Sequence, residues 1–121
     1  MKNIKIDSRL NAEGTSFHGT VIPVNPRAFS QFMGADHVSD DYKISREWIC
    51  RYKGKVYCIY DWKSTDLYAK GLYSVKDFWS KSGLEELHIG SKSSMLEEQE
   101  FLEELLMEYK RFISITKIVG E

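Results

Sequence analysis

YKISREWICRYKGKVYCIYDWK, residues 42–63, contains two runs of strand-forming residues separated by a Lys53-Gly54 turn. β-Branched and aromatic residues favour strands, and a glycine within a short loop favours a hairpin. We therefore predict an antiparallel hairpin at the centre of the fold.

The length of the hairpin loop decides which side chains share a face of the sheet. A two-residue loop pairs Tyr52 with Lys55 and mixes charged residues with Trp48 on one face. A three-residue loop, with Gly54 in the left-handed region, pairs Arg51 with Lys55 and separates charged from apolar residues better. We predict the three-residue loop, because antiparallel sheets commonly have one packed and one wet face. The predicted apolar face consists of Ile44, Trp48, Cys50, Tyr52, Val56, Cys58, Tyr60 and Trp62, with Arg46 as its one charged member. The predicted polar face consists of Lys43, Ser45, Glu47, Ile49, Arg51, Lys55, Tyr57, Ile59, Asp61 and Lys63.

The length and charge of the chain indicate how many domains it forms and which partners it is expected to lack. Its 121 residues fit one domain, which we place at residues 1–121, and are enough to bury a core. The net charge is −1, so we expect no attraction to DNA, RNA or an anionic membrane. No stretch resembles a signal peptide or a membrane span, so a cytoplasmic location is expected. Cys50 and Cys58 are both predicted on the apolar face as buried thiols, with a disulfide between them as the alternative.

Local signals predict the remaining elements before and after the hairpin. Asn25 and Pro26 suit the N-cap and first position of a short helix that ends at Gly34. Pro23 indicates either that the preceding strand lies at a sheet edge or that the strand ends near this residue. The expected segments are a partly ordered lead-in at 1–14, a strand at 15–24, an acidic loop at 35–41, a long loop at 64–83 with a short helix at 74–81, and a strand at 84–90.

One long helix is predicted near the C-terminus. Ser94-x-x-Glu97 forms a capping box, and apolar residues recur at helical spacing from Met95 to about Ile113. We expect this helix to cover the Trp48 and Tyr60 face, which gives an α+β fold: a small antiparallel sheet packed under one long C-terminal helix. Residues 114–121 are expected to form a tail or an edge strand, or to mediate self-association.

The polar face of the hairpin offers a candidate ligand site. Lys43 and Lys63 are predicted to face one another, which is unfavourable unless a negative charge lies between them. The charge is supplied either by the carboxylates of Glu47 and Asp61, as on an ordinary solvated surface, or by an anionic ligand. In the second case the lysines and Ser45 would bind phosphate oxygens, and the carboxylates would accept hydrogen bonds from a base or ribose.

His88 is the best single candidate outside the hairpin. It ends a predicted strand and precedes Gly90, so its imidazole can donate to phosphate or stack on a base while the backbone approaches closely. No neighbouring motif supplies a catalytic partner, and a structural role is the alternative. The histidines and cysteines lack the spacing of a metal site, so we expect no metal and no cofactor.

Short motifs in these regions occur together in one order. They are K-x-S-x-E-W at residues 43–48, I-Y-D-W-K at 59–63 and H-I-G at 88–90, with Gly34 and the acidic pair Asp40-Asp41 upstream. The combination resembles a group of small bacteriophage proteins with the pattern K-x-S/T-x-E-W, I-Y-D-W/Y-K and W-H-I-G-G. The resemblance spans residues 30–93, and the chain departs from it at Leu87, where the pattern has Trp, and at Ser91, where it has Gly.

This group is similar to the fourth anti-CBASS class of phage immune-evasion sponges, which bind nucleotide second messengers and withhold them from host effectors without cleavage. The resemblance implies a non-enzymatic, nucleotide-binding homo-oligomer of the host bacterial cytosol. It also implies binding roles for residues of the three motifs. The candidate ligand-binding residues are Lys43, Ser45, Glu47, Asp61, Lys63, His88 and Ser91.

Two other function classes stay open. The first is a phosphodiesterase that degrades such a nucleotide, with His88 and either Glu47 or Asp61 as acid and base. The second is an inhibitor that contacts a host protein through the 64–83 loop and the C-terminal tail and binds no small ligand.

Overall fold

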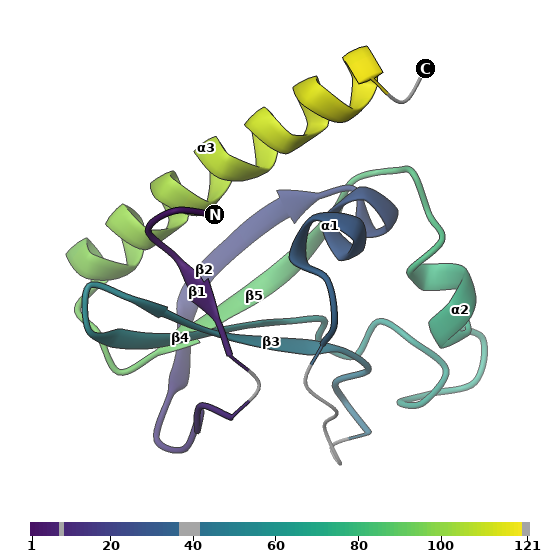
Figure 1. Cartoon of the computed structure of the whole chain (residues 1–121). Helices are drawn as coiled ribbons and strands as arrows, with labels where there is room; N and C mark the ends of the chain where they lie inside the picture. Colours follow the sequence, from purple (N-terminus) through teal and green to yellow (C-terminus); the bar gives the residue numbers. More distant parts are fainter. Residues whose placement is uncertain (8, 37–41, 120–121) are drawn as a thin grey trace.

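A five-stranded antiparallel sheet forms the centre of the protein, and one long helix packs against it (Figure 1). The computed structural model describes residues 1–7, 9–36 and 42–119. The strands lie in the order β1-β3-β4-β5-β2. The elements are β1 (Lys5–Ile6), β2 (Ser16–Val24), α1 (Pro26–Met33), β3 (Glu47–Tyr52), β4 (Lys55–Tyr60), α2 (Val75–Phe78), β5 (Glu85–Ser91) and α3 (Met95–Val119). The predicted α+β fold is confirmed.

The signals around α1 act as the sequence predicts. The side chain of Asn25 accepts a hydrogen bond from the backbone N–H of Ala28 at 3.1 Å, and Pro26 begins the helix. Gly34 caps the C-terminal end with a φ of +81°, a conformation that glycine adopts readily. β2 is an edge strand, which explains how it accommodates Pro23.

The predicted register of the hairpin is wrong. Tyr52 pairs with Lys55, so the loop has two residues, Lys53 and Gly54, with φ of +49° and +77°. Two consecutive left-handed residues are typical of a type I′ turn, whose twist matches that of the strands. The faces therefore differ from those predicted.

The face toward α3 carries Trp48, Cys50, Tyr52, Tyr57 and Ile59. The opposite face carries a smaller buried cluster of Ile49, Cys58 and Tyr60, against which Leu10 and Ala12 of the N-terminal segment pack. Both faces are thus covered in part, so the rule of one packed and one wet face does not apply to this hairpin.

The two cysteines are free and buried, as predicted, but they lie on opposite faces of the sheet. Burial raises the pKa of Cys50 to about 12, and the neighbouring Cys58 adds to the shift. Burial also raises the pKa of Cys58, so both thiols are protonated at neutral pH.

α3 begins at the predicted capping box. The backbone N–H of Glu97 donates to the Ser94 hydroxyl at 3.2 Å, and the Glu97 carboxylate accepts from the backbone N–H of Ser94 at 2.9 Å. Phe101, Leu105 and Tyr109 are buried against the sheet and α1. The helix continues to Val119, so the predicted end near Ile113 is too early and an edge strand at 114–119 is wrong. Residues 120–121 lie outside the described residues.

The other predicted segments differ in detail. The lead-in at 1–14 contains the short strand β1, which pairs with β3, and Ile4 is buried in the core. The loop at 64–83 contains α2, for which Ser74 is the N-cap. Phe78 and Trp79 are buried and hold this loop against the core. Residues 37–41 of the acidic loop lie outside the described residues.

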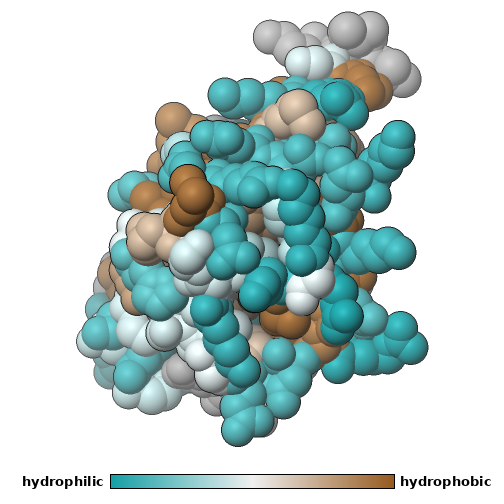
Figure 2. Space-filling view, turned by 90° about the vertical axis from the view of Figure 1, so that its left-hand side faces the viewer, coloured by the Kyte–Doolittle hydropathy of each residue, from teal (hydrophilic) through white to brown (hydrophobic). Residues whose placement is uncertain are grey.

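The side of the molecule that carries the start of α3 and the turn of the hairpin is mainly hydrophilic, with small separate hydrophobic areas (Figure 2). Among the described residues, no helix is both long and apolar enough to cross a membrane.

Candidate functional site

Aromatic rings gather on the sheet face opposite α3, where β2, β4 and β5 lie side by side. β5 runs between β4 and β2, so His88 lies between Tyr60 and Phe17. The His88 ring stacks on Phe17, with 3.9 Å between centroids and 11° between planes. Trp62, just after β4, is also roughly parallel to His88, at 6.0 Å and 20°. Tyr60 meets His88 at 5.6 Å and 63°. We call Phe17, Tyr60, Trp62 and His88 the aromatic cluster.

Two lysines flank the indole ring of this cluster. The Nζ atom of Lys43 lies 5.6 Å from the Trp62 ring centroid, and the Nζ atom of Lys63 lies 5.5 Å from it. The backbone N–H of Lys63 donates to the carbonyl of Lys43 at 2.8 Å, which holds the two segments side by side. Cation–π attraction stabilises each ammonium group near the ring. The predicted proximity of the two lysines is confirmed.

Two tyrosines extend the same site outward. The Tyr42 and Tyr68 rings are parallel within 1°, with 6.1 Å between centroids, and both are exposed. The Nζ atom of Lys43 lies 5.5 Å from the Tyr42 ring, and that of Lys63 lies 5.1 Å from the Tyr68 ring. Tyr68 belongs to the 64–83 loop, so this loop contributes to the site.

Lys63 has a strained backbone. Its φ is +55°, in the left-handed region that residues other than glycine rarely adopt. Such a conformation costs about 1–3 kcal/mol and is concentrated at functional sites. The lysine in this conformation has its Nζ atom near the indole ring.

Asp61 and Ser45 lie behind the site and support it. Asp61 is fully buried, and its carboxylate accepts hydrogen bonds from the backbone N–H groups of Ser45 and Arg46, both at 2.9 Å. It also accepts from the Ser45 hydroxyl at 2.7 Å, and that hydroxyl accepts from Trp79 Nε1 at 2.9 Å. These bonds fix the chain two residues after Lys43 and two residues before Lys63. The predicted placement of Asp61 on an open polar face is wrong, because its charge is satisfied by donors within the protein.

Glu47 and His88 share the face of the aromatic cluster. Glu47 pairs across the strands with Tyr60. Burial raises the pKa of Tyr60 to about 12, with smaller contributions from the neighbouring Cys58 and Glu47 side chains. Burial also lowers the pKa of His88, an effect that Glu86 partly opposes. A neutral His88 at pH 7 suits stacking and hydrogen bonding better than charge pairing.

The structure thus separates the seven predicted site residues into groups. His88 belongs to the aromatic cluster, and Lys43, Glu47 and Lys63 lie around it. Ser45 and Asp61 instead hold the backbone of the site from inside. Ser91 is fully buried on the α3 side of the sheet, where its hydroxyl donates to Glu98.

The aromatic cluster was not predicted from the sequence. Tyr60 and Trp62 were expected in the core under the long helix, and no role in the site was predicted for Phe17. The two-residue loop register would have placed Tyr60 on the Glu47 face. Phe17 pairs across the strands with Gly90, and no local signal in the sequence predicts that pairing.

The arrangement suits a planar, negatively charged ligand. Aromatic rings stack on nucleobases, at about 1–3 kcal/mol per base, and ammonium groups bind phosphate oxygens. Among the described residues, no group of three or more histidine, cysteine, aspartate or glutamate side chains is arranged to hold a metal ion.

Comparisons with known proteins give no family assignment. No protein-family model matches the chain, and no curated protein is significantly similar to it in sequence.

Proposed function

We propose that the protein binds a cyclic or related signalling nucleotide at the aromatic cluster and its two lysines, and sequesters it without cleavage. The main support is that the Nζ atoms of Lys43 and Lys63 both lie within 5.6 Å of the Trp62 ring centroid, and that Trp62 lies beside the Phe17–His88 stack. Ammonium groups can bind phosphate oxygens, and aromatic rings can stack on a base, so one site offers groups for both parts of a nucleotide.

The biological setting proposed is evasion of a bacterial nucleotide-signalling defence by a phage. The motif resemblance at residues 43–48, 59–63 and 88–90 supports it, and all three motifs contribute residues to the site. We propose a homo-oligomer on the same resemblance, to be measured by light scattering coupled to size exclusion.

Titration with a panel of cyclic dinucleotides, cyclic trinucleotides and ADP-ribose derivatives tests the binding claim. We expect tight, saturable binding of at least one compound, measured by calorimetry, and intact ligand by chromatography after the protein is denatured. Lys63→Ala should weaken binding about 10- to 100-fold, because a charge-assisted hydrogen bond contributes about 1.5–3 kcal/mol. Lys110→Ala removes the same charge from the exposed surface of α3 and should leave binding unchanged.

Chemically altered ligand would instead favour the phosphodiesterase alternative. In the structure, Asp61 accepts internal hydrogen bonds, so that alternative would rest on Glu47, which lies on the same sheet face as His88 with Tyr60 between them.

A second candidate function is contact with a host protein. Four large apolar or aromatic residues of the 64–83 loop are 40–51% exposed: Leu67, Tyr68, Leu72 and Tyr73. If this loop carries the function, the double variant L67S/L72S should lose protection in a cell-based defence assay while it retains nucleotide binding. If sequestration carries it, Lys63→Ala should lose protection and the double variant should not.

A further inference from the structure

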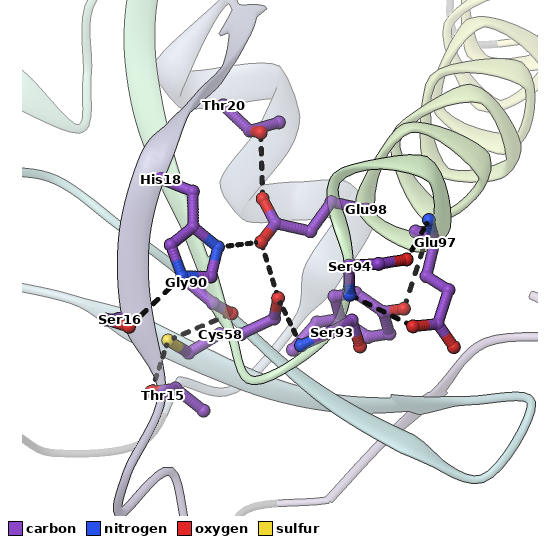
Figure 3. Close-up of polar contacts among 12 residues, drawn as sticks. Thr15, Ser16, His18, Thr20, Cys58, Gly90, Ser93, Ser94, Glu97 and Glu98 are labelled. Atoms are coloured by element: carbon purple, nitrogen blue, oxygen red, sulfur yellow. Dashed lines mark hydrogen bonds and ion pairs between the residues drawn. The ribbon is translucent and has the colours of Figure 1, made fainter.

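The buried carboxylate of Glu98 lies on the α3 side of the sheet, on the opposite face from the aromatic cluster. Glu98 is in the first turn of α3 and is fully buried. Its Oε1 accepts a hydrogen bond from the Thr20 hydroxyl at 2.8 Å, and its Oε2 accepts from the Ser91 hydroxyl at 2.6 Å and from His18 Nδ1 (Figure 3). Burying a carboxylate is unfavourable without such partners, and the helix N-terminus adds favourable partial charge. The structure therefore holds a fixed acceptor against the imidazole ring.

The imidazole of His18 connects this carboxylate to a hydroxyl group. Because Nδ1–H donates to Glu98, the neutral ring has its lone pair on Nε2. The Oγ atom of Ser16 lies 3.2 Å from that Nε2 atom (Figure 3). A carboxylate, an imidazole and a hydroxyl in this order are the groups with which unrelated enzymes activate a serine nucleophile, whatever their order along the chain.

Accessibility and backbone geometry suit this role. The Glu98 side chain is 0% exposed and the His18 side chain 34%, while Ser16 is exposed at the surface. The β2–β5 register is irregular between Phe17 and Val21, and Gly19, within that interval, has a φ of +99°. β-Bulges of this kind re-aim side chains and are frequent beside active sites. Ser16 thus lies at the surface while the carboxylate behind the imidazole is buried and fixed by its hydrogen bonds.

We propose that Ser16 is an activated nucleophile toward small activated acyl esters, with His18 as general base and Glu98 as a positioning residue. Ser16 Oγ forms a bond to the ester carbonyl carbon as its proton passes to His18 Nε2. The ester C–O bond then breaks, and the leaving alcohol receives that proton. Water, deprotonated by His18, attacks the acyl-serine, which releases the carboxylic acid and restores the Ser16 hydroxyl.

Labelling of the full-length chain with diisopropyl fluorophosphate tests the nucleophile directly. The Oγ–P bond forms as the P–F bond breaks, and fluoride leaves. We expect an adduct that peptide mass mapping places on Ser16 in the folded protein but not in the urea-unfolded protein. Ser82→Ala, which removes another exposed serine hydroxyl, should not change the rate. Absence of an adduct on Ser16 in the folded wild-type chain would overturn the proposal without any variant.

Variants then test the base and the positioning residue. His18→Gln should slow labelling of Ser16, and hydrolysis of p-nitrophenyl acetate, at least about 100-fold, because general-base catalysis contributes about 10²–10⁴. Glu98→Gln should slow both reactions and should also remove the low-field Nδ1–H proton resonance of His18 in NMR spectra. Labelling at the wild-type rate in folded His18→Gln would overturn the role of the base, and the same result in folded Glu98→Gln would overturn the positioning role.

Discussion

Replacing Asp61 with alanine separates an internal supporting role from a ligand-binding role. The carboxylate accepts two backbone N–H bonds at 2.9 Å and the Ser45 hydroxyl at 2.7 Å. Removing it leaves the N–H groups of Ser45 and Arg46 without an acceptor, and an unsatisfied buried donor costs about 1–3 kcal/mol. Two such groups give about 2–6 kcal/mol. Because both residues are half-buried, water reaches them in part, and we expect about 2–4 kcal/mol.

The assay is urea unfolding of Asp61→Ala and of Lys63→Ala beside the wild type. Lys63 is exposed, and its replacement by alanine keeps the same backbone conformation, so its free energy of unfolding should change by less than about 0.5 kcal/mol. An Asp61→Ala protein within about 0.5 kcal/mol of the wild type would refute the supporting role of the carboxylate. Its charge would then be available for a ligand, as the sequence first suggested.

Three further predictions follow from burial, strain and protonation. Trp48→Ala should lower the free energy of unfolding by about 3–5 kcal/mol in urea, because the ring is fully buried against Phe29 and Trp79; a change below about 1 kcal/mol would contradict its place in the core. Lys63→Gly should raise the free energy of unfolding by about 1 kcal/mol, because glycine relieves the strained φ. The same variant lacks the lysine contact and should bind the nucleotide more weakly in calorimetry. A variant that loses both stability and binding would argue against stored strain. Burial lowers the pKa of His88 from 6.5, so as pH falls below about 6.5 the unfolded chain takes up a proton that the folded chain resists, and stability is lost. The melting temperature of His88→Phe should therefore decline less than that of the wild type between pH 7 and 5, and equal declines would count against this contribution.

Elements with local signals were predicted well from the sequence. The cap at Asn25, Pro26 at the start of α1, Gly34 after it and the Ser94 and Glu97 capping box each act through hydrogen bonds or backbone preferences within a few residues. Such signals do not depend on the rest of the fold. The antiparallel sheet under a long helix followed from them and from the hydrophobic pattern.

The hairpin register depends on contacts with parts of the chain that lie far from the hairpin in sequence. The prediction assumed that Asp61 could not share a face with Trp48, yet backbone donors satisfy that carboxylate in the interior. It also assumed one open face, whereas Leu10 of the N-terminal segment packs against the buried cluster on that face. Long-range contacts of this kind cannot be read from residues 42–63 alone.

The candidate site was predicted in part for the same reason. The two lysines and His88 were named from residue type and position, and the structure places all three near Trp62. The stack on Phe17 was missed, because it requires the pairing of β2 with β5 across more than 70 residues of sequence. Likewise, Ser16, His18 and Glu98 meet only once α3 lies against that edge of the sheet.

Nucleotide sequestration is best tested by calorimetric titration of the wild type and Lys63→Ala with the nucleotide panel, followed by chromatography of the released ligand. We expect saturable binding of a signalling nucleotide, recovery of the intact compound, and affinity about 10- to 100-fold weaker in the variant. Equal affinity in the two proteins, or no binding of any nucleotide in the panel, would contradict it.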